Sequence, residues 1–252
     1  MAHPVQYSLN LAGNEIILNG LIDHTLVIRY LNQINCIKCG RITSKSFAQG
    51  YCFPCFRSAP ETEECVLRPE LCRAHEGIAR DIKFSKAHCL IDHYVYLSYT
   101  SGFKVGVTRN TQIPVRWIDQ GAIMAVKIAK TPNRYLAGCI EVAMKEHFND
   151  KTQWRLMLKD ISKNIDINPE RERALDLMPE EFISYRITSG EPVRFDYPVV
   201  QYPENIRSIS LDKNPLLSDK LVGIKGQYLI FESGLVFNVR SHSGYLIELQ
   251  IP

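Results

Sequence analysis

Two Cys-x-x-Cys pairs, Cys36-Ile-Lys-Cys39 and Cys52-Phe-Pro-Cys55, constrain this chain more than any other feature, and twelve residues separate them. Each pair places two thiolates on one face of a tight turn, and Gly40 gives the first turn backbone freedom. Two such turns joined by a short hairpin supply four sulfurs to a tetrahedral Zn²⁺ site. Disulfide bonds and a redox pair are the alternatives, although a redox pair needs no duplicate at this spacing. We therefore expect a structural zinc ribbon.

A second group of cysteines and histidines follows the ribbon. One interpretation is a second zinc site from two cysteines, one histidine and one residue of a later group, with His88 as the first choice, although its spacing matches no standard pair of knuckles. The alternative is a compact connector of buried thiols and hydrogen-bonded histidines, because free cysteine is among the most buried residue types. The early members are Cys65, Cys72 and His75, the later ones are His88, Cys89 and His93, and Cys139 is expected in a core.

Composition places the chain among ordinary globular proteins, since 45% of its 252 residues are hydrophobic and 23% are charged. The amino terminus has no basic segment leading into an apolar core, and no stretch approaches the ~18 apolar residues of a membrane span. We therefore expect a soluble, cytoplasmic protein without a membrane partner.

The distribution of charge says more than the net charge of +3. From Ser101 to Arg134 there are six basic residues against one acid, and from Ile34 to Arg57 there are four and no acid. A surface that faces phosphates needs such locally cationic stretches. The sequence therefore predicts a nucleic-acid partner, RNA or DNA, and the expected contact residues are Lys38, Arg41, Lys45 beside Ser46, and Arg109.

Both ends of the chain have β patterns. Residues 4–11 alternate apolar and polar before a turn at Gly13-Asn14, and the carboxyl end has three β-rich runs punctuated by Ser233-Gly234 and Ser243-Gly244. Each terminal piece is short for an independent sheet, so we expect the amino-terminal hairpin to join a carboxyl-terminal barrel or sandwich. The expected segments are this hairpin (1–33), the zinc ribbon and Cys/His connector (34–90), a small sheet with helices (91–150), a helical segment (151–190) and the β-domain (191–252).

Helices are expected between these β regions, which makes the fold class α+β. Thr131-Pro132 is typical of a cap followed by proline at the first helical position, and Asn168-Pro169 opens another helix by the same argument. A further helix is suggested by the apolar residues Trp154, Leu156, Met157, Leu158 and Ile161.

Residues 94–110, YVYLSYTSGFKVGVTRN, predict two strands around a Ser-Gly turn, followed by a loop with Arg116, an apolar segment and a helix with Glu141. This arrangement resembles the GIY-YIG nucleases from Tyr94 to Asn149. Tyr94-Val95-Tyr96 stands where that family has Gly-Ile-Tyr, and Lys104-Val105-Gly106 stands where it has Tyr-Ile-Gly. With KVGVTR, RWIDQGA and GIKGQYLIF, the chain also resembles an uncharacterised bacterial domain-of-unknown-function family over most of its length.

The GIY-YIG resemblance implies a small mixed sheet with helices and a centre for phosphodiester hydrolysis. It implies that Tyr96, assisted by Lys104, is the base, and a neighbouring ammonium lowers the pKa of a tyrosine. It implies that Arg116 grips phosphate and that Glu141 holds Mg²⁺ or Mn²⁺. The sequence departs from the family pattern at Tyr94, at Lys104 and in the late position of Arg116.

Three function classes remain open from the sequence. The leading one is a zinc-ribbon protein that binds nucleic acid through the ribbon and a GIY-YIG-like centre, with metal-dependent endonuclease activity left open. The second is a non-catalytic module that keeps the fold and interacts with RNA, the ribosome or a protein. The third is a zinc-scaffolded enzyme for another small substrate, because a fold alone does not establish a function.

Overall fold

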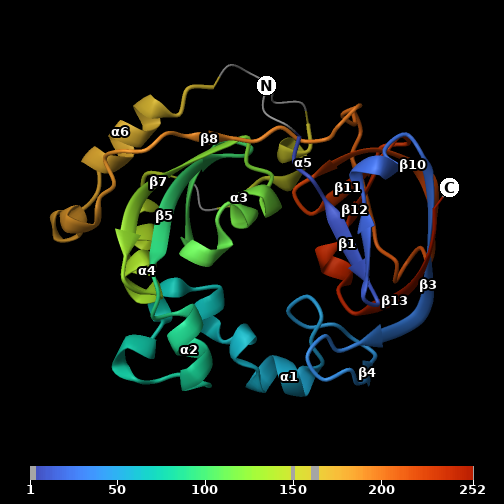
Figure 1. Ribbon diagram of the computed structural model, residues 1–252, viewed down its shortest axis with the longest axis horizontal. Helices are drawn as coiled ribbons and strands as arrows, with labels where there is room; N and C mark the ends of the chain where they lie inside the picture. Colours follow the sequence, from blue (N-terminus) through green and yellow to red (C-terminus); the bar gives the residue numbers. More distant parts are fainter. Residues whose placement is uncertain (1–3, 149–150, 160–164, 252) are drawn as a thin grey trace. The chain divides into compact units, whose positions relative to one another are not determined.

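The computed structural model of the chain describes residues 4–148, 151–159 and 165–251 (Figure 1). The fold is α+β, as the sequence predicts, with short helices and three sheets. No helix in these ranges is long and apolar enough to cross a membrane.

Two compact units make up the chain, and both are discontinuous in sequence. The first, here called the β unit, comprises Met1–Arg57, Leu158–Asp160 and Asp196–Pro252. The second, here called the mixed unit, comprises Ser58–Met157 and Ile161–Phe195. The boundary in the cysteine-rich region therefore falls inside the expected 34–90 segment, and it assigns the two cysteine groups to different units.

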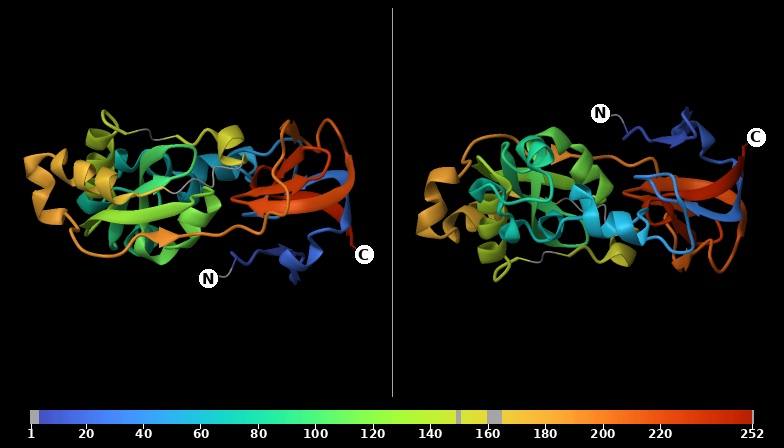
Figure 2. Two further views of the ribbon diagram at one scale, coloured as in Figure 1. Left: turned by 90° about the horizontal axis from the view of Figure 1, so that it is seen from above. Right: turned by 90° about the horizontal axis from the view of Figure 1, so that it is seen from below.

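The β unit is organised around the long strand β3 (Thr25–Asn35), which pairs antiparallel with β10 (Leu216–Lys225) and β13 (Tyr245–Gln250) (Figure 2). Strand β3, drawn in blue, thus lies among the red and orange strands of the carboxyl end. Alternate residues of β13 are half-buried and exposed, which is the period of a strand with one packed face. The remaining strands of this sheet are β4 (Ile42–Thr43), β9 (Arg207–Ile209), β11 (Tyr228–Phe231) and β12 (Leu235–Asn238).

The amino-terminal hairpin forms a separate two-stranded sheet of β1 (Ser8–Leu11) and β2 (Asn14–Ile17). Its side chains Leu9 and Ile16 pack against the apolar core of the β unit. The hairpin therefore joins the carboxyl-terminal strands by packing, while β3 joins them by backbone hydrogen bonds.

One turn at the carboxyl end was not expected. The run from residue 221 to 231 is two strands, β10 and β11, because the chain reverses at Gly226, whose φ is +61°. An L-residue rarely adopts this backbone conformation, whereas glycine does so at little cost. The carboxyl end thus has four strands in place of the three expected runs.

The mixed unit contains a four-stranded sheet in the order β6-β5-β7-β8, and each pairing is antiparallel, a difference from the mixed sheet that we expected. Strands β5 (His93–Tyr99) and β6 (Phe103–Arg109) are the expected hairpin. The apolar segment after Arg116 becomes β7 (Met124–Thr131), and β8 is Val193–Arg194.

Helix α4 (Arg134–Met144) starts two residues later than the sequence predicts. Thr131 still belongs to β7, and the cap is Asn133, whose Oδ1 accepts a hydrogen bond from the Leu136 backbone N–H at 2.9 Å. Helix α5 is short (Trp154–Met157), and Ile161, which we expected in it, lies outside the described residues.

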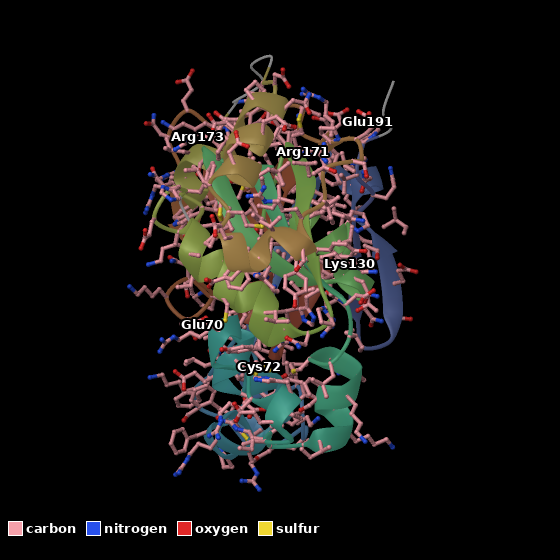
Figure 3. All side chains as sticks on the ribbon, turned by 90° about the vertical axis from the view of Figure 1, so that its left-hand side faces the viewer. Glu70, Cys72, Lys130, Arg171, Arg173 and Glu191 are labelled. Atoms are coloured by element: carbon pink, nitrogen blue, oxygen red, sulfur yellow. The ribbon has the colours of Figure 1, made fainter. Side chains whose placement is uncertain are left out.

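Helix α6 (Asn168–Asp176) begins at the expected Asn168-Pro169 pair. It also binds the backbone of residues 187–190 through Arg171. Arg171 is 6% exposed, and its guanidinium donates hydrogen bonds to the carbonyl oxygens of Gly190 and Ser189 at 2.8 Å and of Ile187 at 3.3 Å. Arg173 on the same helix is instead half-exposed and pairs with Glu170 (Figure 3).

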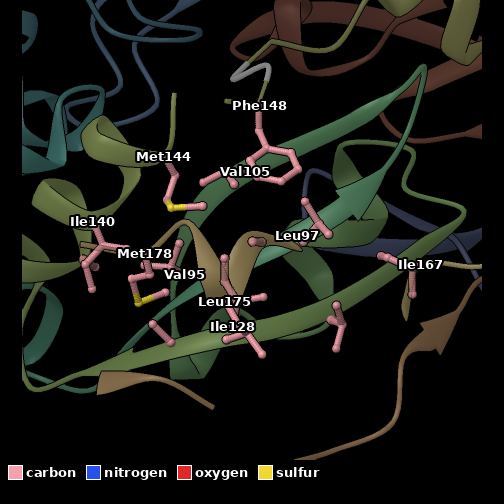
Figure 4. Packing of buried hydrophobic residues seen from close by; sticks show 14 of the residues in the cluster. Val95, Leu97, Val105, Ile128, Ile140, Met144, Phe148, Ile167, Leu175 and Met178 are labelled. Atoms are coloured by element: carbon pink, nitrogen blue, oxygen red, sulfur yellow. The ribbon is translucent and has the colours of Figure 1, made fainter. Parts of the chain in front are cut away.

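The core of the mixed unit lies where α4 and α6 cover one face of the sheet (Figure 4). Val95 and Leu97 of β5 meet Ile140 and Met144 of α4 and Leu175 of α6 there. Tyr96 stands between Val95 and Leu97 in β5 and belongs to a second apolar cluster, together with Trp117 of α3 (Val115–Asp119). Helix α3 covers the opposite face of the sheet. The alternation along β5 thus directs one tyrosine toward α3.

The connector after residue 58 is a series of short helices that includes η3 (Glu64–Val66), η4 (Pro69–Leu71) and α2 (Ile82–His88). The backbone of η4 lies directly on α4 at Gly138, where a Cβ would collide with the Glu70 amide nitrogen. Gly138 therefore allows the connector to pack closely against α4, the helix that carries Glu141.

The other helices are short, with three to six residues each. They are η1 (Asn19–Leu21), α1 (Phe53–Ser58), η2 (Pro60–Thr62), η5 (Ala74–Glu76), η6 (Asn110–Gln112), η7 (Glu180–Tyr185) and η8 (Arg240–His242).

Candidate functional site

The four ribbon cysteines, Cys36, Cys39, Cys52 and Cys55, converge in the β unit, with their Sγ atoms within 4.8 Å of one another. The first turn is closed by a hydrogen bond from the Gly40 N–H to the Cys36 carbonyl oxygen at 2.8 Å, with Gly40 at a φ of +72°. The second pair lies at the start of α1, and the Cys39 and Cys52 sulfurs are 3.9 Å apart.

The chemistry of this donor set suits a thiophilic divalent metal. Burial opposes ionisation of Cys36, yet hydrogen bonds from the backbone of Cys52, Cys39 and Lys38 lower its pKa to about 6. Four cysteine sulfurs that can surround one ion are a ligand set that zinc prefers in structural sites. The cluster could therefore hold a metal such as zinc.

A second sulfur cluster lies in the connector of the mixed unit. Cys65 of η3, Cys72 directly after η4 and Cys89 at the carboxyl end of α2 are all buried, and their Sγ atoms lie within 4.8 Å of one another. Arg134 Nη1 lies 3.7 Å from the Cys65 sulfur, so a positive charge stands beside the thiols. This cluster could also hold a metal, with three protein ligands.

The histidines that we expected in the second site have other partners. The His75 ring stacks on Tyr135 at 4.4 Å between ring centroids. His88 Nδ1 donates to the Phe84 carbonyl oxygen at 2.9 Å, and its ring stacks on Phe84. The structure therefore brings Cys89, and neither His75 nor His88, to the two earlier cysteines.

The residues that the resemblance nominated for catalysis meet at one cavity of about 180 Å³. Tyr96 comes from β5, Lys104 from β6, Arg116 from α3 and Glu141 from α4. Tyr96 is 0% and Lys104 is 4% exposed, and the other two are half-buried. The wall is completed by residues that include Val66, Leu67 and Pro69 of the connector and Lys145, which pairs with Glu141 at 3.6 Å.

Gln120 is a cavity residue that the sequence analysis missed. Its Oε1 accepts a hydrogen bond from the Tyr96 hydroxyl at 2.8 Å and another from Lys104 Nζ at 2.6 Å. Gln120 follows Arg116 by four positions, and residues at this spacing lie on the same face of a helix. That spacing was the signal that could have identified it.

The electrostatics of Tyr96 differ from the expectation. Burial raises the pKa of its hydroxyl to about 12, the Arg116 guanidinium acts against this rise and the Glu141 carboxylate adds to it. The pKa of Tyr96 is thus raised, whereas the sequence analysis expected it to be lowered beside Lys104. In the free protein Tyr96 is a neutral phenol at pH 7.

Gly106 makes room for this tyrosine. It pairs with Tyr96 across β5 and β6, and a Cβ at residue 106 would lie 2.6 Å from the Tyr96 hydroxyl oxygen. The glycine of the Lys-Val-Gly motif is therefore required by close packing of an aromatic ring on the neighbouring strand.

The four residues expected to contact nucleic acid are divided between the two units. Lys38, Arg41 and Lys45 belong to the ribbon in the β unit, where the first two are exposed and Lys45 Nζ lies 5.4 Å from the Phe47 ring centroid. Arg109 belongs to the mixed unit, at the end of β6.

Fold and site together define an α+β protein with two cysteine clusters that could hold metal ions and a polar cavity beside a small antiparallel sheet. The chain belongs to the family described as "Protein of unknown function (DUF2797)", whose model matches residues 23–247. Comparisons with curated proteins and with solved structures gave no match.

Proposed function

We propose that this protein binds zinc and nucleic acid and cleaves phosphodiester bonds at a GIY-YIG-like centre. The observation that supports the proposal is the convergence of Tyr96, Lys104, Arg116 and Glu141, which come from four elements, on one cavity. A set of unrelated surface residues would not be expected to line the same small cavity. Zinc at Cys36, Cys39, Cys52 and Cys55 is structural in this proposal, because four protein ligands leave no position for a substrate.

Each cavity residue has a role that its chemistry suits. The planar guanidinium of Arg116 binds two phosphoryl oxygens, and Lys104 adds positive charge where charge develops. Glu141 offers one hard carboxylate, which together with substrate phosphate is a typical Mg²⁺ or Mn²⁺ site. Such a cation would stabilise the leaving oxygen. Tyr96 would accept the proton of the attacking water as a phenolate, after a cation held by Glu141 has lowered its pKa and its own hydroxyl proton has passed to solvent. Gln120 orients the hydroxyl.

The ribbon suits single-stranded nucleic acid in this proposal. Phe47 lies 5.4 Å from Phe53 and 5.8 Å from Phe56 between ring centroids, and Phe53 is 51% exposed. The cations Lys45 and Arg57 lie over rings of this group at 5.4 and 5.9 Å. Bases stack on exposed aromatic rings while neighbouring cations follow the phosphates.

Substitution of Glu141 tests the proposal. The wild type should nick single- or double-stranded RNA or DNA when Mn²⁺ or Mg²⁺ is added, and Glu141→Gln should bind equally but cut at least about 100-fold more slowly, because the cation loses its carboxylate. Glu146→Gln is the matched control, since it removes the same charge from an exposed position shortly after α4. Gel-based cleavage assays and a thermal melt of each variant provide the measurements.

The raised pKa of Tyr96 favours a second candidate, a binding module without catalysis, because a neutral phenol is a poor base. If the wild type retains nucleic acid but cuts none of the four substrates with either metal, this second candidate replaces the nuclease. If it retains no nucleic acid, an enzyme for a different small substrate becomes the better proposal. Cleavage that survives Glu141→Gln would also contradict the assignment.

A further inference from the structure

A second polar cavity of about 190 Å³ adjoins the candidate active cavity, with which it shares Val66, Pro69, Val107 and Arg116. Three arginines line it: Arg109 at the end of β6, Arg116 of α3, which the two cavities share, and Arg134 at the start of α4. The other lining residues are His93, Thr108 and Gln112, and none of the described residues that line it is acidic.

No carboxylate among the described residues that line the cavity balances the charge of these arginines, although the thiols of the second cysteine cluster lie beside Arg134. Arg134 is only 9% exposed, and its guanidinium donates to the carbonyl oxygens of Cys65 and His88 at 3.4 Å and contacts the Cys65 sulfur. Neither Arg134 nor Arg109 pairs with a carboxylate within the described parts of the chain. Burial and the neighbouring charge of Arg134 lower the pKa of Arg109, although Cys89 acts in the opposite direction.

His93 does not relieve this imbalance. It is 1% exposed, and its Nδ1 donates to the Ile91 carbonyl oxygen at 2.8 Å, which fixes the ring. Burial and the two nearby guanidinium groups, Arg134 and Arg109, lower its pKa to about 4, although the hydrogen bond to Ile91 and the charge of Asp92 act in the opposite direction. The ring is therefore neutral at pH 7, and three arginines determine the charge of the cavity.

We propose that this cavity binds a phosphate group. Planar guanidinium groups match phosphate oxygens in pairs, and buried arginines without carboxylates gain most from a small dianion or monoanion. The volume is below the roughly 300 Å³ at which pockets for drug-sized ligands begin. Because Arg116 and three apolar residues line both cavities, the phosphate next to the scissile one in a nucleic-acid strand fits this position. That last step rests on the proposed function, whereas binding of a free phosphate does not.

The first experiment titrates the full-length protein with inorganic phosphate by isothermal calorimetry at low ionic strength. Arg109→Gln should weaken binding at least about tenfold, because one charge-assisted pair is lost. Arg155→Gln is the matched control, since Arg155 is exposed and its guanidinium lies 4.3 Å from the Trp154 ring centroid. It should bind phosphate like the wild type. Absence of phosphate binding, or equal binding by Arg109→Gln, would overturn the inference.

The second experiment distinguishes a strand phosphate from a free one. A short single-stranded oligonucleotide should bind Arg109→Gln more weakly than wild type, with the dependence of log K on log salt reduced by roughly 0.7, the value for one released counterion. If the oligonucleotide does not bind the wild type while inorganic phosphate does, the proposed function fails and the site belongs to a small phosphorylated ligand. If the oligonucleotide binds both proteins with equal affinity and salt slope, the strand assignment is refuted.

Discussion

Gly106 and Tyr96 show how one missing side chain determines the position of a functional one. The ring of Tyr96 occupies the space above residue 106, and both of its neighbours in the chain, Val95 and Leu97, are completely buried. The ring consequently cannot move aside without a change in the core. The glycine is therefore part of the candidate site although it carries no functional group.

Replacement of this glycine is the first prediction at the residue scale. Gly106→Ala should lower the free energy of unfolding by about 1 to 3 kcal/mol, since overpacking in a well-packed region costs this much. Gly102→Ala is the control, because a Cβ at residue 102 meets nothing within 4 Å. Urea denaturation of both variants measures the difference, and equal stabilities would refute the steric role of Gly106.

The sequence predicted individual residues where a motif fixes their spacing. The tyrosine, lysine, arginine and glutamate of the cavity could be named because the chain resembles the GIY-YIG family, although Arg116 comes later than in that family's pattern. Gln120 could not, since its importance depends on two hydrogen bonds that cross between α3 and the sheet. Cys89 was weighed with its neighbouring histidines, and only the orientation of α2 shows that its sulfur lies with those of Cys65 and Cys72.

At the scale of secondary-structure elements, α6 shows how a helix can hold a long strand connection in place. Arg171 of α6 donates hydrogen bonds to the carbonyl oxygens of residues 187, 189 and 190, just before β8. A guanidinium is well suited to this task because its donors point in several fixed directions. The segment that leads into β8 therefore depends on one buried side chain.

Two substitutions on α6 test this dependence. Arg171→Met keeps the aliphatic stem but removes the donors, and it should destabilise the protein by about 2 to 3 kcal/mol, because hydrogen bonds from a charged group are lost. Arg173→Met should cost less than about 1 kcal/mol, because the Arg173–Glu170 pair is half-exposed to solvent. Chemical denaturation gives both values. If the two costs are equal, Arg171 does not anchor the segment.

Elements were predictable where local signals agree with the fold. The hairpin β5–β6 follows from alternating residues around Ser101-Gly102, and α6 follows from its opening proline. The start of α4 was misplaced because Thr131 and Asn133 are both good caps, and only the length of β7 decides between them. The turn at Gly226 was missed because a single glycine between two apolar runs also fits a continuous strand.

At the scale of the whole molecule, the chain is a combination of two discontinuous units, and each carries its own sulfur cluster. The pairing of β3 with β10 joins residues about two hundred positions apart, and no local pattern specifies such a partner. The sequence predicted only that the terminal β segments belong together, from their small size.

Metal content provides the prediction for the whole molecule. Protein purified without added metal should contain two zinc ions per chain, because each cluster brings at least three sulfurs within 4.8 Å of one another, close enough to bind one ion together. Cys52→Ser and Cys72→Ser should each reduce the content to about one, since serine is a weak zinc ligand.

Cys139→Ser is the control for this measurement, because Cys139 belongs to neither cluster. It should retain two zinc ions. Elemental analysis by mass spectrometry counts the metal in each variant. A wild type with one zinc, unchanged by Cys72→Ser, would show that the second cluster is a group of free thiols.

The contact of η4 with Gly138 has a consequence for how the protein responds to its chemical surroundings. Cys72 follows η4 immediately, and Val66 and Pro69 of the same connector form part of the wall of both cavities. Peroxide oxidises thiolates, and zinc starvation would empty the second cluster if it holds zinc. Either change would then loosen the connector at Cys72 and with it the cavity wall. We expect oxidative stress to weaken ligand binding reversibly, with recovery when a reductant and zinc are restored together.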